Sequence, residues 1–232
     1  MPIQPPIHGY ILAGGQSSRM GTDKAVLPFG SSTLLDRASA ALQLFCSDVT
    51  VVGRAEHPST PRAIPDHITS AGPVAGIVSA LADLAERRGT WAFFVPVDVP
   101  LLPGDLLRAL VTDWLSHPLI RIAFPVADGT PQPVISLIHV AALAPLQHSL
   151  DLNQRRLRPA LETAAAHLAE QLAAPVGNVL HTPTLATRDG FVLANGLRLP
   201  WQPSPEQLAI ADLWFANANT PEELERLRGS AT

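Results

Sequence analysis

The sequence is poor in cysteine, in charge and in aromatic residues. Its 232 residues include a single cysteine, Cys46, so no disulfide can form within the chain, and this use of cysteine favours the reducing cytoplasm. Charged residues make up 16%, aromatic residues make up 5%, and the formal net charge is -4. Because no overall positive field attracts nucleic acid or anionic membranes, any phosphate-binding site must be local.

Long apolar runs are missing as well. The sequence has no stretch of about 18 apolar residues without proline or charge, so we expect no membrane span. No cationic start followed by an apolar stretch marks a secretory signal. Hydrophobic residues nevertheless make up 47%, and the 23 prolines fall mostly between periodic segments. We therefore expect one α/β domain over residues 1–232, with a full hydrophobic core.

The stretch from residue 9 to residue 24 is the most informative part of the chain. The apolar run Tyr10–Ala13 predicts a short buried strand close to the N-terminus. It is followed by a loop that contains Gly14, Gly15 and Gly21. Glycines allow sharp turns and a close approach of backbone N–H groups to a ligand, and successive N–H groups in such a loop bind anions.

Arg19 and Lys24 place two cations in this same loop. Of the 16 basic residues, 15 are arginine and Lys24 is the only lysine, which suggests that this position requires an ammonium group. Arginine can bind phosphate oxygens with two parallel hydrogen bonds, whereas lysine acts as a movable point charge. The loop has neither the Gly-Lys-Ser/Thr ending of a P-loop nor a G-x-G-x-x-G pattern. It indicates a nucleotide phosphate site, and the alternative is a surface turn with two solvated charges.

The rest of the chain alternates between short apolar runs and amphipathic segments. Strand, helix and strand joined by short links imply parallel pairing and an α/β fold. We expect helices over 31–46, capped by Ser31 or Ser32, and over 72–88, 103–115, 140–150 and 153–172. We expect strands over 48–53, 63–66, 91–97, 120–126 and 132–138.

The C-terminal part of the chain shows turn and capping signals. Asp189-Gly190 and Asn195-Gly196 favour a hairpin within 182–203, a segment that we expect to be an inserted flap. Short strands are expected over 176–181 and 191–194. Two capping boxes, which begin at Ser204 and Thr220, each predict the start of a helix.

Asp98 directly follows the most apolar strand of the chain, residues 91–97. A continuous apolar run is typical of a central strand, and ligands of open parallel sheets bind at the carboxyl ends of strands. A carboxylate at a dry strand end costs roughly several kcal/mol unless a partner compensates it. Mg²⁺, which takes one or two carboxylates together with phosphate oxygens, is such a partner. The alternative is that Asp98 bonds the following backbone in a turn.

These motifs together resemble those of a known family. Residues 12–25, Leu-Ala-Gly-Gly-x-Ser-x-Arg-Met-Gly-x-Asp-Lys-Ala, resemble the signature of the molybdenum cofactor guanylyltransferases, the MobA family, which belongs to the nucleotidyltransferases with a Rossmann-like fold. The resemblance extends over nearly the whole chain except 182–203. Further matching motifs are Pro65-Asp66 with 72–76, Asp98–Leu101, Gln132-Pro133, and Asn217–Leu224.

The resemblance implies a fold, a reaction and its partners. The fold would have three layers, with a mostly parallel central sheet and helices on both faces. The reaction would transfer GMP from GTP to the terminal phosphate of molybdenum-molybdopterin, form molybdopterin guanine dinucleotide and release pyrophosphate. The implied cofactor is Mg²⁺, and the implied partners are GTP, molybdopterin and the chaperones or biosynthesis proteins that handle the product. Nucleic acid and membranes are not expected partners, and the expected location is the cytoplasm.

The resemblance also assigns roles to individual residues. The residues with a catalytic role would be Arg19, Lys24, Asp98, Asn217 and Asn219. The nucleotide would be bound by Leu12, Ala13, Gly14, Gly15, Lys24, Gly53, Asp66 and Asp98. The acceptor would be bound by Gln132, Pro133, Arg155 and Arg156. The metal would be bound by Asp98.

One departure from the family pattern concerns the second strand. The family commonly has an asparagine at its end, whereas Gly53 stands here and offers no side chain, so base selection would rest more on backbone. The pair Gly14-Gly15 favours the guanine branch over the cytidylyl branch, which resembles Leu-Ala-Ala-Gly. Two alternatives remain. One is a nucleotidyltransferase for another base or acceptor, such as a molybdopterin cytidylyltransferase or a sugar-phosphate nucleotidyltransferase. The other is a non-catalytic module that binds nucleotide or pterin.

Overall fold

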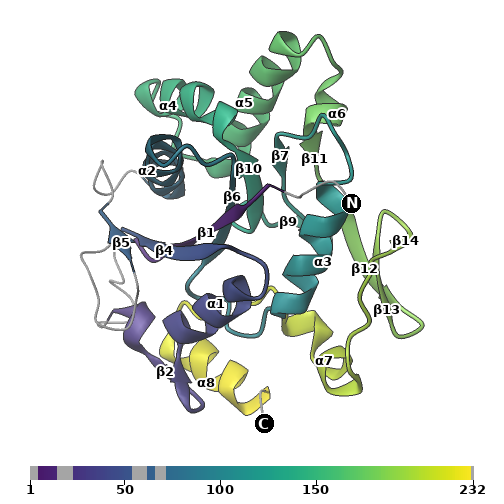
Figure 1. Ribbon diagram of the computed structural model, residues 1–232. Helices are drawn as coiled ribbons and strands as arrows, with labels where there is room; N and C mark the ends of the chain where they lie inside the picture. The colour runs from purple at the N-terminus through teal and green to yellow at the C-terminus, as the bar shows by residue number, and fades with distance from the viewer. Residues whose placement is uncertain (1–4, 15–22, 54–61, 66–71, 231–232) are drawn as a thin grey trace.

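A seven-stranded sheet with the strand order β11-β7-β10-β6-β1-β4-β5 forms the centre of the molecule (Figure 1). The computed structural model describes residues 5–14, 23–53, 62–65 and 72–230. The strands of the main sheet are β1 (Ile7–Leu12), β4 (Asp48–Val52), β5 (Ala63–Ile64), β6 (Trp91–Pro96), β7 (Ile122–Ala123), β10 (Ser136–His139) and β11 (Leu180–His181).

The main sheet is mostly parallel. Strand β1 pairs in parallel with β4 and β6, β4 pairs in parallel with β5, and β11 pairs in parallel with β7. Strand β10 lies between β6 and β7 and runs antiparallel to both. The prediction of a mostly parallel central sheet is therefore confirmed.

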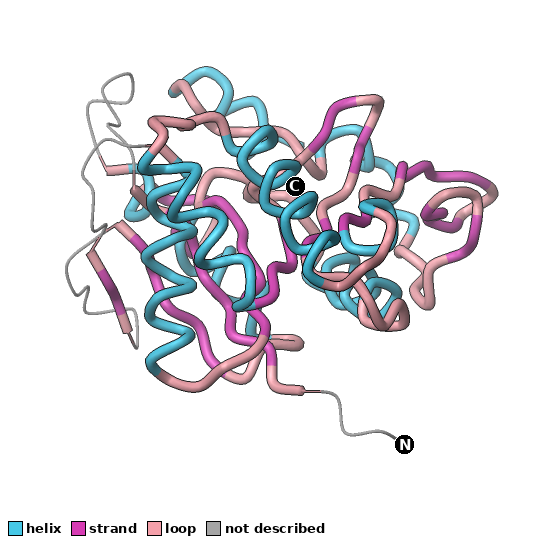
Figure 2. Tube along the Cα trace, turned by 90° about the horizontal axis from the view of Figure 1, so that it is seen from above, coloured by secondary structure: helices cyan, strands magenta, loops and turns pink. Residues whose placement is uncertain are grey.

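Alternate side chains of the central strands build two separate cores. Ile11 and Phe93 pack with α1 (Leu34–Gln43) and α3 (Gly104–Trp114) on one face. Tyr10 and Phe94 pack on the other face with three helices, which are α2 (Pro73–Glu86), α4 (Leu143–Asp151) and α5 (Leu157–Gln171). This alternation follows from the two-residue period of a strand. It produces the predicted three layers, with helices on both sides of the strands (Figure 2).

A second, five-stranded sheet lies beside the main one, in the order β14-β13-β12-β8-β9. Its strands are β8 (Val126–Ala127), β9 (Thr130–Pro131), β12 (Thr184–Arg188), β13 (Phe191–Ala194) and β14 (Leu197–Arg198). The turns at Asp189-Gly190 and Asn195-Gly196 have positive φ angles at both residues, as two-residue hairpin turns require. The predicted hairpin is confirmed, and most of the segment 182–203 lies in this small sheet.

The remaining elements are short or C-terminal. They are η1 (Lys24–Val26), β2 (Pro28–Phe29), β3 (Ser32–Thr33), η2 (Val140–Ala142), α6 (Val176–Val179), α7 (Pro205–Ala209), η3 (Ala211–Leu213) and α8 (Pro221–Ser230). Both predicted capping boxes are present, with Ser204 capping α7 and Thr220 capping α8. Over the described part of the chain, no helix has both the length and the apolar character that a membrane crossing needs.

Two of the predicted strands are wrong because proline interrupts them. The apolar run 120–126 divides at Pro125 into β7 and β8, which belong to different sheets. Proline has no N–H to donate to a ladder, so the chain changes sheets there. The strand predicted over 132–138 begins only at Ser136, because residues 132–135 form a turn in which the Ile135 amide donates to the Gln132 carbonyl at 3.0 Å.

Several helix or strand boundaries also differ from the prediction: the first strand, predicted over 10–13, is Ile7–Leu12, and the helix predicted over 140–150 consists of η2 followed by α4. The cap of α1 is Thr33, which forms a capping box with Asp36, and neither Ser31 nor Ser32 has this role. Helix α5 begins at Leu157, because Asn153 has a left-handed φ of 61° that cannot belong to a helix. Residues 176–179 form the single turn α6 after Pro175, so only Leu180 and His181 remain as strand.

Candidate active site

The carboxyl ends of four parallel strands meet at one edge of the main sheet. Leu12 is in register with Val52 and with Pro96, and Val52 is in register with Ile64. Residues 13, 53, 65 and 97, which directly follow β1, β4, β5 and β6, therefore lie side by side at this edge. The start of the antiparallel β10 lies at this same edge. An edge of this kind is the usual ligand site of an open α/β sheet.

Three side chains from distant parts of the sequence meet at this edge. The Lys24 ammonium donates to Asp98 Oδ2 at 2.8 Å and to Asn219 Oδ1 at 2.8 Å. Lys24 begins η1, Asp98 follows β6, and Asn219 precedes α8. The structure thus brings together the cationic and the acidic residue that the sequence singled out, and adds an amide from the C-terminal segment.

The local sequence around each of these residues fixes its position. Asp23 caps η1 by accepting a hydrogen bond from the Ala25 amide at 3.1 Å, which places Lys24 at the start of this turn. The Ala218 amide donates to the Asp98 carbonyl at 2.8 Å and joins the C-terminal segment to the end of β6. The capping residue Glu223 accepts from the Asn219 amide at 2.7 Å.

The Lys24–Asp98 pair is largely shielded from water, since the two side chains are exposed by only 17% and 18%. An ammonium has three donors, and the two bonds described here use two of them. A carboxylate can accept one lysine donor and still offer oxygen lone pairs. Asp98 and Asn219 supply carboxylate and amide oxygens, which are the hard ligands that Mg²⁺ prefers, so this donor set fits that ion.

Backbone hydrogen bonds to the two neighbouring strands fix the chain at the end of β1. The Ala13 amide donates to the Val52 carbonyl at 3.0 Å, and the Leu12 carbonyl accepts from the Val97 amide at 3.2 Å. Of the residues predicted to bind the nucleotide, Leu12 and Ala13 therefore have their carbonyl and amide, respectively, engaged inside the sheet, and Gly14 is the first residue beyond these bonds. Gly53 has a φ of 87°, a left-handed value that glycine adopts without strain.

The residues predicted to bind the acceptor lie in two segments. Gln132 and Pro133 occupy the turn before β10, where the Gln132 amide donates to the Pro125 carbonyl at 2.8 Å. Arg155 donates to Asn153 Oδ1 at 2.8 Å, and Arg156 is the N-cap of α5. A Cβ atom built on Gly72 would lie 3.5 Å from the Arg155 carbonyl, so this basic segment lies against the N-terminus of α2.

Among the predicted residues not yet placed, Asn217 lies in the described part of the chain. Asn217 is exposed, whereas its neighbour Asn219 contacts Lys24. Gly15, Arg19 and Asp66 lie outside the described residues.

Asp23 and Glu223 have no site role in the prediction from sequence. Both position other site residues through capping, and the signals were present in the Asp-Lys pair and in the box that begins at Thr220. The role of Glu223 in the site depends on the packing of the C-terminal segment against the end of β6, which no local sequence pattern contains.

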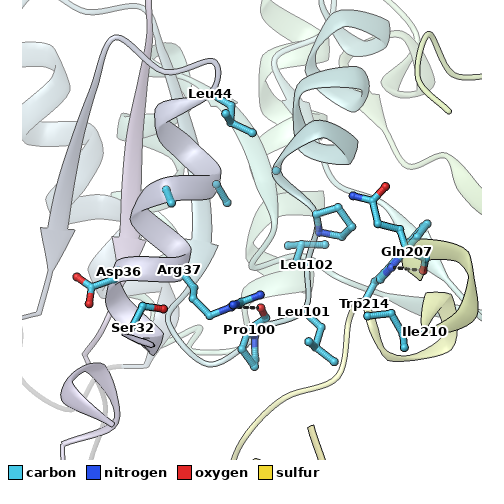
Figure 3. A pocket seen from close by; sticks show the side chains of 14 residues that line it. Ser32, Asp36, Arg37, Leu44, Pro100, Leu101, Leu102, Gln207, Ile210 and Trp214 are labelled. Carbon is cyan, nitrogen blue, oxygen red and sulfur yellow. Dashed lines mark hydrogen bonds between the residues drawn. The ribbon is translucent and has the colours of Figure 1, made fainter. Parts of the chain in front are cut away.

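A groove of about 640 Å³ opens next to this edge, between α1, the loop after β6 and residues 207–214 (Figure 3). Its lining is mostly apolar and includes Leu44, Leu101, Leu102, Ile210 and Trp214. None of Lys24, Asp98 and Asn219 lines it. The groove is therefore a neighbour of the polar cluster and not part of it.

Comparison with known proteins identifies a family and several relatives. The family model of the MobA-like NTP transferase domain matches residues 9–173. A probable molybdenum cofactor guanylyltransferase of Rhodopirellula baltica is 34% identical over 171 residues, which cover 69% of this chain and 81% of that protein. A molybdenum cofactor guanylyltransferase of Rhizobium johnstonii is 32% identical over 212 residues, covering 90% of this chain and 93% of that protein.

A similar fold occurs among solved structures. The crystal structure of molybdopterin-guanine dinucleotide biosynthesis protein A from Archaeoglobus fulgidus has a TM-score of 0.64 and 19% identity, covering 97% of this chain and 98% of that one. The 2-C-methyl-D-erythritol 4-phosphate cytidylyltransferase from Thermus thermophilus has a TM-score of 0.57 and 14% identity, covering 96% of this chain and 97% of that one. At these identities the similarity concerns the fold alone.

Proposed function

The chain belongs to the family of MobA-like NTP transferases, its relatives include molybdenum cofactor guanylyltransferases, and we propose that it transfers GMP from GTP to the terminal phosphate of molybdenum-molybdopterin. The products are molybdopterin guanine dinucleotide and pyrophosphate. The observation that carries this proposal is the convergence of Lys24, Asp98 and Asn219 at the carboxyl edge of the sheet.

The central physical difficulty of this reaction is that one anion attacks another. An oxygen of the acceptor phosphate forms a bond with the α-phosphorus of GTP, while the bond from that phosphorus to the bridging oxygen breaks and pyrophosphate leaves with the electron pair. The acceptor is already ionised, so no protein nucleophile is required. Catalysis then depends on positioning and on compensation of charge.

Compensation of charge is the role of Lys24 and Arg19. The third donor of the Lys24 ammonium binds a phosphate oxygen, while Asp98 and Asn219 hold the other two donors. The role of Arg19 is supported by the sequence motif, since the residue lies outside the described residues. Two cations at the triphosphate lower the repulsion that the incoming acceptor meets.

Asp98 and Asn219 form the oxygen-rich side of the site, and they would hold Mg²⁺. When bound, Mg²⁺ supplies positive charge to the oxygens of the triphosphate. Asn219 orients the Lys24 ammonium through its Oδ1 atom. Asn217, which is exposed two residues earlier, contacts the acceptor or the nucleotide once these are bound.

The base and the acceptor bind on either side of this centre. The guanine lies against the backbone at Gly14 and Gly15, with Gly53 leaving room and Asp66 bonding the base or the ribose. The acceptor lies toward the remaining assigned residues, which are Gln132, Pro133, Arg155 and Arg156. Arg155 and Arg156 would attract its phosphate, because they flank the N-termini of α2 and α5, where helix dipoles already favour anions. The single cysteine suits the cytoplasm, where we place the reaction.

Paired turnover assays test this function. The purified chain is incubated with molybdopterin and Mg²⁺ and either GTP or CTP, and pyrophosphate release is measured. We expect release with GTP far above that with CTP. Preference for CTP would instead identify a cytidylyltransferase, and release with a sugar phosphate in place of molybdopterin would identify another acceptor. Binding of GTP without release for any acceptor would indicate a non-catalytic module.

A further inference from the structure

A group of three potential metal ligands lies at the far end of α3. Asp113 in the last turn of α3, His117 in the following loop and His181 in β11 each offer one ligand atom, and these atoms all lie within 4.8 Å of one another. The rings of His117 and His181 are 4.8 Å apart between centroids. His181 Nε2 lies 3.6 Å from Asp113 Oδ2, which is long for a hydrogen bond.

The backbone that carries these three side chains is well fixed. The His117 amide donates to the Trp114 carbonyl at 3.1 Å, and the His117 carbonyl accepts from the Ile120 amide at 3.2 Å. The His181 carbonyl accepts from the Phe124 amide at 3.1 Å, and β11 is paired with β7. The three ligands therefore do not depend on a loose loop for their approach.

The accessibility of the three side chains suits an ion that enters from solvent. His181 and Asp113 are exposed by only 17% and 28%, whereas His117 is exposed. His117 therefore forms the open side of the group, and water can occupy a fourth position there. Three protein ligands with one open position are typical of a zinc site of the His/carboxylate type.

The chemistry of the donors selects the class of metal. Two imidazole nitrogens with one carboxylate suit zinc and similar divalent transition metals, whereas Mg²⁺ prefers oxygen ligands. Ligand atoms about 2.0–2.2 Å from a tetrahedral zinc are about 3.4 Å apart, so side-chain movements of about 1 Å would complete the geometry. The exposed His117 side chain can make most of this adjustment.

From this geometry we propose that Asp113, His117 and His181 bind a divalent transition-metal ion, with zinc as the expected occupant. The ion connects the end of α3 to β11 at the edge of the main sheet, where Figure 1 shows both elements. Residue 184, the start of β12 in the small sheet, follows His181 by three positions. The ion would therefore fix the position of the chain where it passes from β11 in the main sheet to β12 in the small sheet.

This site is separate from the proposed nucleotide site. Asp98 precedes the first turn of α3, whereas Asp113 lies in its last turn, and a helix of 11 residues is about 16 Å long. Zinc binding should therefore be independent of the residues assigned to catalysis. A failure of the proposed GMP transfer would leave this proposal untouched.

The test is zinc binding by the full chain without an affinity tag, after treatment with a chelator. Equilibrium dialysis against ZnCl₂ with excess Mg²⁺ measures zinc per chain, and Co²⁺ serves as a visible probe of tetrahedral coordination. We expect one zinc per chain, a higher Tm with zinc, and no displacement by Mg²⁺. The variant Asp98→Asn should bind zinc as the parent chain does.

Three variants locate the site. His117→Ala changes an exposed loop residue and should keep the fold, yet weaken zinc binding by more than the roughly 10- to 100-fold that loss of an outer-shell partner causes. Asp113→Asn should weaken it as well. The matched control, His167→Ala, removes an exposed imidazole on α5 that contacts Gln171, and should change nothing. Absence of zinc from the parent chain, or equal binding by His117→Ala and His167→Ala, would overturn the proposal.

Discussion

Lys24 is the residue whose surroundings carry the strongest chemical constraint. Its ammonium fits between two oxygens at 2.8 Å in a largely buried position, in a chain that otherwise uses arginine for its positive charge. A guanidinium is planar and larger, and its donors point in fixed directions. Replacement of this lysine by arginine preserves the charge but not the geometry.

We therefore predict that Lys24→Arg lowers the rate of pyrophosphate release by about 100-fold, the range seen when one donor to a developing anion is lost. The measurement is the initial rate at saturating GTP. The control is Arg108→Lys, which makes the reverse exchange at an exposed ion pair on α3 and should leave the rate unchanged. A normal rate for Lys24→Arg would remove the argument that this position requires an ammonium.

Asp98 is expected to act through its negative charge. Asp98→Asn keeps the size of the side chain but loses the charge that would hold Mg²⁺ and neutralise Lys24. We predict that the Mg²⁺ concentration for half-maximal pyrophosphate release rises by at least tenfold, which is about 1.4 kcal/mol. Asp105→Asn, an exposed change on α3, is the control. An unchanged Mg²⁺ dependence in Asp98→Asn would exclude this carboxylate as a ligand.

Helices α1 and α3 pack closely against each other at Gly104. A Cβ atom at this position would lie 2.8 Å from the Ala41 Cα atom and 2.9 Å from the Ala41 carbonyl oxygen. Backbone cannot move aside as a flexible side chain can, so the two helices would have to separate. This contact lies directly after the loop that carries Asp98.

We predict that Gly104→Ala lowers the free energy of unfolding by about 1–3 kcal/mol, as overpacking does, despite the better helix propensity of alanine. The measurement is urea denaturation. Gly177→Ala in α6 is the matched control, because a Cβ atom there meets nothing within 4 Å, and it should not destabilise the protein. Equal stability of the two variants would show that α1 and α3 pack less tightly than described.

On the face of the sheet that α2 covers, opposite to α1 and α3, a polar network joins α2 to β1 and to the residue before β5. Asp83 on α2 accepts hydrogen bonds from the Tyr10 hydroxyl at 2.8 Å and from Arg62 at 2.7 Å and 2.5 Å, and Arg87 lies 3.6 Å away. Burial alone would raise the pKa of the Asp83 carboxyl. The bonds from Arg62 and Tyr10 and the charges of both arginines outweigh burial and lower this pKa below its ordinary value.

A lowered pKa in the folded state gives stability that is present above the unfolded pKa and is lost as the pH falls toward the folded pKa. We therefore predict that the free energy of unfolding begins to fall below about pH 4, near the unfolded pKa of aspartate. Asp83→Ala should cost about 3 kcal/mol at pH 7, because it leaves the buried Tyr10 hydroxyl and the Arg62 guanidinium without their partner, whereas Arg87 keeps its ion pair with Asp48. Urea denaturation at several pH values measures both effects, and Asp83→Ala should depend less on pH than the parent chain. The same pH slope in both would contradict this role.

Most elements near the candidate site could be predicted because each depends on a local sequence pattern. The runs at 48–53 and 91–97 are short and apolar, and the segments before α7 and α8 carry complete capping boxes. The prediction of continuous strands over 120–126 and 132–138 is wrong because Pro125 and Pro133 cannot donate a hydrogen bond to a neighbouring strand, and hydropathy does not contain this information. The contact of Asn219 with Lys24 joins residues 195 positions apart, so no local pattern contains it.

At the scale of the whole molecule, the topology explains why a few residues are brought together. Parallel strands end in register at one edge, and the C-terminal segment returns to that edge through the bond between Ala218 and Asp98. The family and the three-layer fold predicted from the sequence are confirmed. The group of Asp113, His117 and His181 escaped prediction because His181 is 64 positions after His117, and only the folded chain brings it to the local pair at the end of α3.

The most direct measurement is a crystal structure of the chain with Mg²⁺ and a GTP analogue that cannot be cleaved. We predict a phosphate oxygen about 3 Å from Lys24 Nζ and Mg²⁺ about 2.1 Å from an Asp98 carboxylate oxygen, at the carboxyl edge of the sheet. A nucleotide bound elsewhere, for example in the groove beside α1, with the Lys24–Asp98 pair untouched, would contradict it.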